Sequence, residues 1–137
     1  MNFHVLDTSV ASMIVDERTN LELYLPHLQN ELSVLPFQAV AELRLGAVLA
    51  NWGEVRRTRL ERFFTNILIQ NSSEDLVNCW VRVMKEARQT GKRLEAADAW
   101  IAATALLLKT PLLTHDKDFS AESCSSIVVN YAATSTV

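Results

Sequence analysis

Acidic side chains occur in this 137-residue chain at positions where the flanking sequence is almost wholly apolar. The clearest is Asp98, which lies in residues 94–109, LEAADAWIAATALLLK, with no further charge before Lys109. An ionised carboxylate buried without a partner costs on the order of 3 kcal/mol or more. Taken alone, Asp98 is best interpreted as a cap, because a carboxylate near a helix start stabilises the exposed N–H groups and the helix dipole. The other interpretation is a cation site shared with further carboxylates.

Three more acidic positions have the same character. Asp7 follows the run FHVL, Asp116 and Asp118 come just after the run PLLT, and Glu42 lies within AVAELRLGAV. Clustered carboxylates repel and raise one another's pKa, and a hard divalent cation relieves that repulsion. One pocket that binds Mg²⁺ would account for all these acids together, so the shared site becomes the better interpretation of Asp98.

Each acid also has a simpler explanation. Asp7 could be the N-cap of a helix, a role that is compatible with binding a metal. Glu42 could be a surface helix residue, although its apolar neighbours disfavour this. Asp116 and Asp118 could be turn formers. His115 beside them is expected to be a solvated loop residue.

A cation held by carboxylates suits phosphodiester hydrolysis, because the metal lowers the pKa of the attacking water and can stabilise the leaving oxygen. Zinc is disfavoured, since the sequence contains no Cys/His ligand set. The two cysteines, Cys79 and Cys124, are expected to be reduced thiols of a cytoplasmic protein.

The elements that must position these acids follow from the spacing of apolar residues. Short apolar runs at residues 3–6, 32–35, 66–70, 111–113 and 127–131 alternate with segments of helical periodicity. This alternation predicts the α/β class, with a three-layer α/β/α arrangement and a central, mainly parallel sheet. Ligands of such folds bind beyond the carboxyl ends of the strands, which is where Asp7 and Asp116 lie.

Local signals predict the helix boundaries. Thr8 and Ser9 are expected to cap a short helix over residues 10–15, and residues 19–22 match a capping box for a helix that Pro26 bends or breaks. A helix from Pro36 should face inward with Phe37, Val40, Ala41, Leu45, Val48 and Leu49. Two more helices are expected over residues 54–64, with Leu60, Phe63 and Phe64 inward, and from a cap at Ser72 or Ser73 to Gly91.

Composition places the chain among globular proteins, with 49% hydrophobic and 21% charged residues. We expect a single domain over residues 1–137, with neither a signal peptide nor a membrane association. A net charge of −3 is poor for a nucleic-acid binder, but nine of the 13 basic residues fall within residues 56–62 and 82–93. These blocks are either solvated helix faces or part of an RNA track, to which Arg44, Arg82 and Lys85 would contribute.

Four segments together resemble one family. They are VLDTSV at residues 5–10, AVAELRLGA at 39–47, AADAWIAATA at 96–105 and LLTHDKDF at 112–119. In this order, and over nearly the whole chain, they resemble the PIN-domain ribonucleases of the VapC toxin type. The resemblance implies that Asp7, Glu42, Asp98 and Asp116 form an acidic quartet for Mg²⁺ or Mn²⁺. It also implies that Asp118 shares or assumes the role of Asp116, and that Thr8, Ser9 and Thr114 are small polar residues beside the pocket.

The same resemblance implies an endoribonuclease that acts as a toxin, forms a homodimer and is paired with a cognate antitoxin. Two alternatives stay close to it, namely a PIN nuclease of RNA processing and a catalytically silent module that binds metal or RNA. A third alternative is an aspartyl-phosphate phosphatase, but that chemistry needs a second Asp two positions after Asp7, where this chain has Ser9.

Overall fold

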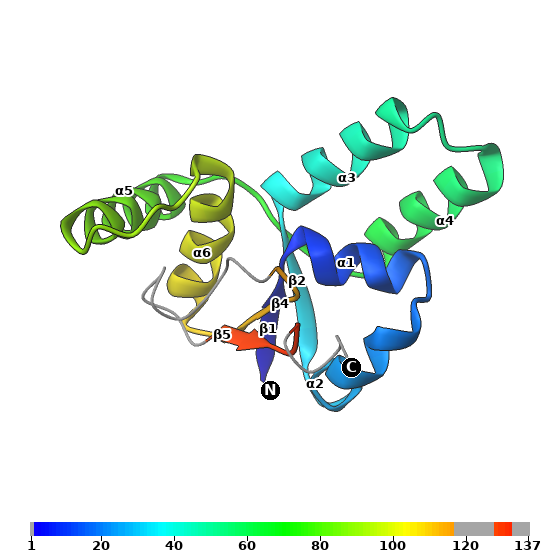
Figure 1. The fold of residues 1–137 in the computed structure, drawn as a ribbon, viewed down its shortest axis with the longest axis horizontal. Coiled ribbons are helices and arrows are strands. Elements are labelled where there is room, and N and C mark those ends of the chain that lie inside the picture. Colours follow the sequence, from blue (N-terminus) through cyan, green and yellow to red (C-terminus); the bar gives the residue numbers. More distant parts are fainter. Residues whose placement is uncertain (1, 117–127, 133–137) are drawn as a thin grey trace.

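The computed structural model describes residues 2–116 and 128–132, so Asp118 and Cys124 lie outside the described residues. Five parallel strands form one sheet in the order β3-β2-β1-β4-β5 (Figure 1). The strands are β1 (Phe3–Leu6), β2 (Leu32–Pro36), β3 (Leu68–Gln70), β4 (Leu112–Thr114) and β5 (Val128–Asn130). The five strands expected from apolar runs are confirmed, with boundaries that differ by one or two residues.

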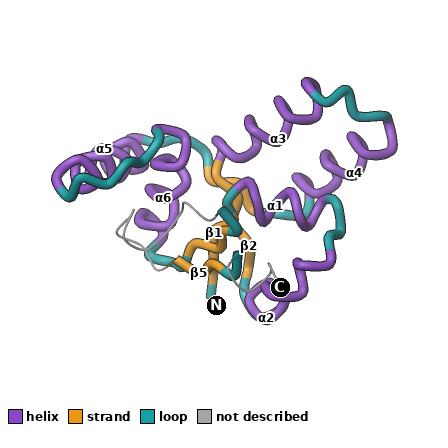
Figure 2. Tube along the Cα trace, viewed as in Figure 1, coloured by secondary structure: helices purple, strands orange, loops and turns teal. Residues whose placement is uncertain are grey.

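Helices connect β1 to β2, β2 to β3 and β3 to β4, and they pack around the sheet (Figure 2). The described helices are α1 (Thr8–Val15), the 3₁₀ helix η1 (Thr19–Tyr24), α2 (Leu25–Asn30), α3 (Phe37–Leu49), α4 (Glu54–Thr65), α5 (Glu74–Gln89) and α6 (Ala96–Leu108). None of them, within the described ranges, is long and apolar enough to cross a membrane.

Successive side chains of the central strands enter two different hydrophobic cores, one on each face of the sheet. Val5 of β1 packs with residues of α5 and α6, whereas the next residue, Leu6, packs with residues of α1, α3 and α4. Val34 and Leu35 of β2 alternate in the same way. Because successive side chains of a strand point to opposite faces, the sheet is covered on both sides. The expected three-layer α/β/α fold is confirmed.

The strand order reverses between β1 and β4, which pair directly although they are far apart in sequence. The Asp7 N–H donates to the Leu113 carbonyl at 3.1 Å, so this pairing continues to the carboxyl ends of both strands. A crevice opens beside such a switch point in doubly wound folds and is their usual ligand site. Figure 1 shows that β1 leads into α1 and β2 leads into α3 on this side of the sheet, and that α6 starts there.

Two expected helix caps are wrong. The first helix begins at Thr8, and its cap is Asp7 rather than Thr8 or Ser9, because the Asp7 carboxylate accepts the Val10 N–H. The predicted capping box at Thr19 does not form, and η1 starts there without a side-chain cap. A separate helix, α2, begins at Leu25, because proline lacks an N–H and fits only the first turn of a helix.

The inward face of α3 differs in part from the prediction, because only Phe37 and Val40 of the expected residues pack against the cores. Its buried residues are Ala39, Leu43 and Ala47, whereas Val48 and Leu49 are 72% and 75% exposed. Leu45 is exposed as well. The helix is apolar around most of its circumference, so the helical period alone could not select the face. The core positions expected for α4 are confirmed at Leu60 and Phe64, and Phe63 is partly buried.

Candidate active site

Asp7 is 4% exposed and sits between the end of β1 and the start of α1. Its Oδ1 accepts hydrogen bonds from the Ser9 hydroxyl at 2.6 Å and from the Val10 N–H at 3.0 Å, and its Oδ2 accepts the Thr114 hydroxyl. Burial raises the pKa of Asp7, these hydrogen bonds lower it, and the charge of Asp116 raises it further. The net shift is upward. Asp7 is therefore oriented firmly but is not neutralised by a cationic side chain among the described residues.

Glu42 points towards the same helix start from α3. Its Oε2 accepts the Thr8 hydroxyl at 2.5 Å, and its Oε1 accepts the Gln38 side-chain amide at 3.3 Å. Glu42 is half-buried, so the interpretation as a freely solvated helix residue does not hold. Thr8 and Gln38 fix both carboxylate oxygens, which connects α3 to α1 beside Asp7.

Asp98 lies in the first turn of α6 and accepts no hydrogen bond from the described residues, so a side-chain cap is not what stabilises it there. Its pKa is raised to about 6, first by burial and then by the negative charges of Asp116, Glu42 and Asp7. A contribution from Glu95 is smaller. Carboxylates interact this way only when they lie near one another, so the fold gathers the four predicted acids around one place.

Asp116 follows β4 and is held through its backbone. Its N–H donates to the Thr114 hydroxyl oxygen at 3.1 Å, and its carbonyl accepts the Asn130 side-chain amide at 2.7 Å. Ser9 supports the same loop, because its hydroxyl oxygen accepts the His115 N–H at 2.9 Å. Ser9 and Thr114 thus each link the Asp7 carboxylate to the loop that carries Asp116.

The donor set fits a hydrated hard cation better than a closed protein cage. Within residues 2–116 and 128–132, no three His, Cys, Asp or Glu side chains are arranged to hold one metal ion directly. Mg²⁺ does not need such a cage, since it keeps several waters and takes one or two direct carboxylates. Four carboxylates whose charges repel, with the pKa of Asp98 raised to about 6, match that requirement.

Sequence patterns did not indicate four residues that support the acids. Gln38 could have been found, because it stands one helical turn before Glu42. Asn130 and Tyr24 are far in sequence from the acids that they support, and only the fold brings them to the site. His115 is half-buried rather than a solvated loop residue, and its Nδ1 lies 2.6 Å from the Tyr24 hydroxyl.

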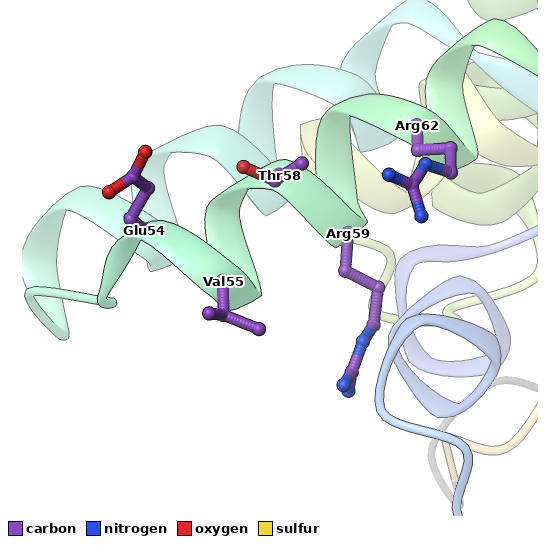
Figure 3. Close-up of a pocket in the computed structure, with 5 residues that line it drawn as sticks. All are labelled: Glu54, Val55, Thr58, Arg59 and Arg62. Carbon is purple, nitrogen blue, oxygen red and sulfur yellow. The ribbon is translucent and has the colours of Figure 1, made fainter.

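The residues predicted to bind RNA lie on exposed helix surfaces, and two of them have acidic partners. Arg44 pairs with Glu61 through two hydrogen bonds of 3.2 and 3.3 Å, and Arg82 lies 3.7 Å from Glu86. Lys85 is exposed on α5. A separate shallow pocket on α4 contains none of the four acids and is lined by Glu54, Val55, Thr58, Arg59 and Arg62 (Figure 3).

A parallel α/β/α sandwich with an acidic cluster at its switch point defines the class of this protein. The sequence matches the PIN domain family over residues 4–121, so the chain belongs to that family. The resemblance predicted from the four sequence segments is thereby confirmed.

Individual relatives are similar over most of the chain. Ribonuclease VapC5 of Mycobacterium tuberculosis is 30% identical over 119 residues, which are 85% of both proteins. The crystal structure of FitAcB from Neisseria gonorrhoeae is 29% identical, with a TM-score of 0.73 over 93% of this chain and 96% of that one. VapBC2 from Rickettsia felis, bound to a DNA fragment from their promoter, has a TM-score of 0.80 at 20% identity, over 93% and 98% of the two chains. At 20% identity, the similarity to VapBC2 shows the fold alone.

Proposed function

We propose that residues 1–137 form one PIN-like domain that acts as an Mg²⁺- or Mn²⁺-dependent endoribonuclease, the toxin of a toxin–antitoxin pair. The observation that carries the proposal is the convergence of Asp7, Glu42, Asp98 and Asp116 at the carboxyl edge of the sheet. The 30% identity to a ribonuclease supports RNA as the substrate.

In this proposal the four carboxylates hold the metal ion and its waters. A bound divalent ion would lower the pKa of the attacking water and balance charge on the phosphate. Water attacks the phosphorus in line, and the bond to the 3′ oxygen breaks, which leaves a 3′-hydroxyl and a 5′-phosphate. Asp118 lies outside the described residues and is proposed to share the role of Asp116.

The surrounding side chains have a positioning task. Ser9, Thr114 and the Val10 N–H fix the oxygens of Asp7, and Thr8 fixes Glu42. Asp98 accepts no such hydrogen bond from the described residues and has its pKa raised to about 6, so its oxygens are available to the cation and to a proton of the water. The fixed positions of Asp7 and Glu42 lower the barrier to reaction, because these groups need not be reorganised in the transition state.

Partner proteins are part of the proposal. VapBC-5 from Mycobacterium tuberculosis, a member of the VapBC family of toxin–antitoxin systems, is 26% identical with a TM-score of 0.68 over 95% of this chain and 98% of that one, which supports a cognate antitoxin for this chain. A basic side chain of that antitoxin would be attracted to the acidic cluster. We further propose a homodimer that acts on RNA in the cytoplasm.

Cleavage of total RNA by the purified protein tests the activity. We expect cleavage with Mg²⁺ or Mn²⁺, none with EDTA, and none with Asp7→Asn or Asp98→Asn. Asp75→Asn is the matched control, because Asp75 is an exposed carboxylate in the first turn of α5. RNA cleavage by folded Asp7→Asn would defeat the assignment.

A silent binding module is the second candidate, and one observation favours it: the Asp7 carboxylate accepts the Val10 N–H as the N-cap of α1, a structural role that needs no metal. Thermal unfolding with Mn²⁺ separates the two. A rise in melting temperature without cleavage indicates a silent metal-binding module, whereas no rise and no cleavage excludes both metal-based proposals.

A further inference from the structure

The Tyr24 hydroxyl is a fully buried polar group with three partners from distant parts of the chain. It donates to the Thr114 carbonyl at 2.7 Å and accepts the Tyr131 N–H at 3.0 Å. It also lies 2.6 Å from Nδ1 of His115. Tyr24 belongs to η1, whereas Thr114 ends β4 and Tyr131 follows β5. One oxygen atom therefore joins three elements at the carboxyl edge of the sheet.

Counting protons assigns a hydrogen to Nδ1 of the His115 ring. The hydroxyl has one hydrogen, and a carbonyl can only accept, so that hydrogen goes to Thr114. The contact with Nδ1 is then a hydrogen bond only if Nδ1 carries a proton and donates it to the Tyr24 oxygen. In the neutral ring Nε2 is left as an acceptor, in agreement with the Asn20 side-chain amide 3.4 Å away.

The two strand ends joined by Tyr24 are those that hold Asp116. Thr114 accepts the Asp116 N–H through its side chain, while its carbonyl accepts Tyr24. On the other strand, Asn130 donates to the Asp116 carbonyl, and the next residue donates its N–H to Tyr24. The Asp116 peptide groups are thus held by two strand ends that are neighbours in the sheet, and the Tyr24 hydroxyl adds a hydrogen bond to each of them.

We propose that Tyr24 is a positioning residue, whose hydroxyl places Asp116 at the acidic cluster and selects the Nδ1–H tautomer of His115. The inference rests on the proposed metal-dependent function, because the value of a fixed Asp116 is to bind the cation. Tyr24 therefore has a role beyond packing in the core. Its ring also packs edge-on against His115 and Tyr131, at centroid distances of 5.5 and 5.0 Å.

Tyr24→Phe separates the two roles, since it keeps the packed ring and removes only the oxygen. Tyr131→Phe is the matched control: it removes a phenol oxygen that contacts His27 at 3.2 Å and keeps the backbone N–H that Tyr24 accepts. Calorimetric titration with Mn²⁺ should show affinity about tenfold weaker for Tyr24→Phe, the usual effect of removing a group that orients a ligand. Tyr131→Phe should remain within about twofold of the wild type.

Imidazole ¹⁵N shifts of His115 provide a readout that core packing would not change. In the wild type Nδ1 should give the shift of a protonated nitrogen, and in Tyr24→Phe the protonated signal should move towards Nε2. Wild-type Mn²⁺ affinity in folded Tyr24→Phe, or an Nε2–H tautomer in the wild type, would overturn the inference. Mn²⁺ binding without RNA cleavage would overturn the proposed nuclease alone, whereas absence of Mn²⁺ binding by the wild type would overturn both.

Discussion

The fully buried hydroxyl of Thr114 donates a hydrogen bond to the Asp7 carboxylate. The same oxygen accepts the Asp116 N–H, so one threonine side chain connects two of the four candidate acids. A hydroxyl can do this because it donates one hydrogen and has lone pairs to accept another. A valine has a similar shape but can do neither.

Thr114→Val should therefore weaken both the metal site and the fold. Loss of the hydrogen bond from Thr114 raises the pKa of Asp7 further, since that bond lowers it now. We expect the free energy of unfolding to fall by about 1–2 kcal/mol. Mn²⁺ affinity should fall by about tenfold. Urea unfolding and Mn²⁺ titration measure the two effects.

Thr104→Val is the control for Thr114→Val. Thr104 is also fully buried, and its hydroxyl donates to the Trp100 carbonyl at 2.9 Å within α6. The two variants should lose comparable stability, but only Thr114→Val should lose Mn²⁺ affinity. Equal loss of Mn²⁺ affinity in both variants would contradict a specific role for Thr114.

Asp98→Asn should stabilise the metal-free protein at neutral pH. The pKa of Asp98 is 3.8 in an unperturbed chain and about 6 in the fold, so the folded state binds this proton more tightly than the unfolded state. The wild type consequently loses stability as the pH rises from about 4 to about 6. Because Asp98 is partly solvated, the gain from Asp98→Asn above that window should be about 1 kcal/mol.

Urea unfolding in EDTA across this pH range checks the sign, with Asp75→Asn as the exposed control. Mn²⁺ should reverse the order, because an ion that binds the native wild type stabilises it by about 2.7 kcal/mol at 100 times its Kd. If Asp98→Asn is less stable than the wild type in EDTA at neutral pH, Asp98 does not carry unfavourable charge.

Much of this site follows from local sequence. Asp7 comes directly after β1 and Asp116 two residues after β4, so parallel strand ends alone predict that they meet. Asp98 is recognisable because the helix around it is apolar, and Ala99 and residues 101–105 are indeed buried.

Other features depend on contacts between residues far apart in sequence. Tyr24 meets Thr114 across 90 positions, and Asn130 meets Asp116 only because β5 pairs with β4. No periodicity indicates such contacts. Most of the inward face of α3 was also beyond prediction, because leucine and valine occur on its solvent side while two of its three buried residues are alanine.

His4 should make the protein sensitive to acid. Its ring is fully buried, with Nδ1 3.1 Å from Glu31 and Nε2 2.5 Å from the Ser33 hydroxyl. Burial lowers the pKa of His4 below 6.5, and this outweighs the hydrogen bond and charge of Glu31, which raise it. His27, which also faces Glu31, lowers it slightly. As the pH falls, the unfolded chain therefore binds a proton at His4 before the folded protein does.

This contribution to stability is complete above pH 6.5 and is lost as the pH falls below that value. His4→Gln should reduce the loss of stability between about pH 7.5 and about pH 5.5 by roughly 1 kcal/mol, even if it lowers stability at both. Urea unfolding at the two pH values gives the slope of the free energy of unfolding against pH. An unchanged slope would show that His4 does not titrate differently in the two states.

Charge reversal on α5 tests the path of the RNA. Arg82 and Lys85 are one helical turn apart on an exposed surface, and phosphate contacts make binding weaker as salt rises. Arg82→Glu with Lys85→Glu should weaken RNA binding in EDTA by about tenfold at low salt and reduce its salt dependence. Fluorescence anisotropy across a salt series measures both quantities.

The matched variant carries Arg59→Glu and Arg62→Glu, which lie at the same spacing on α4 and change the net charge equally. If RNA follows α5, this second variant should lose less affinity than the first, since only long-range charge acts on it. A larger loss from the α4 variant would place the RNA along the pocket in Figure 3. Unchanged binding in the α5 variant would discard Arg82 and Lys85 as RNA contacts and leave them as a solvated helix face.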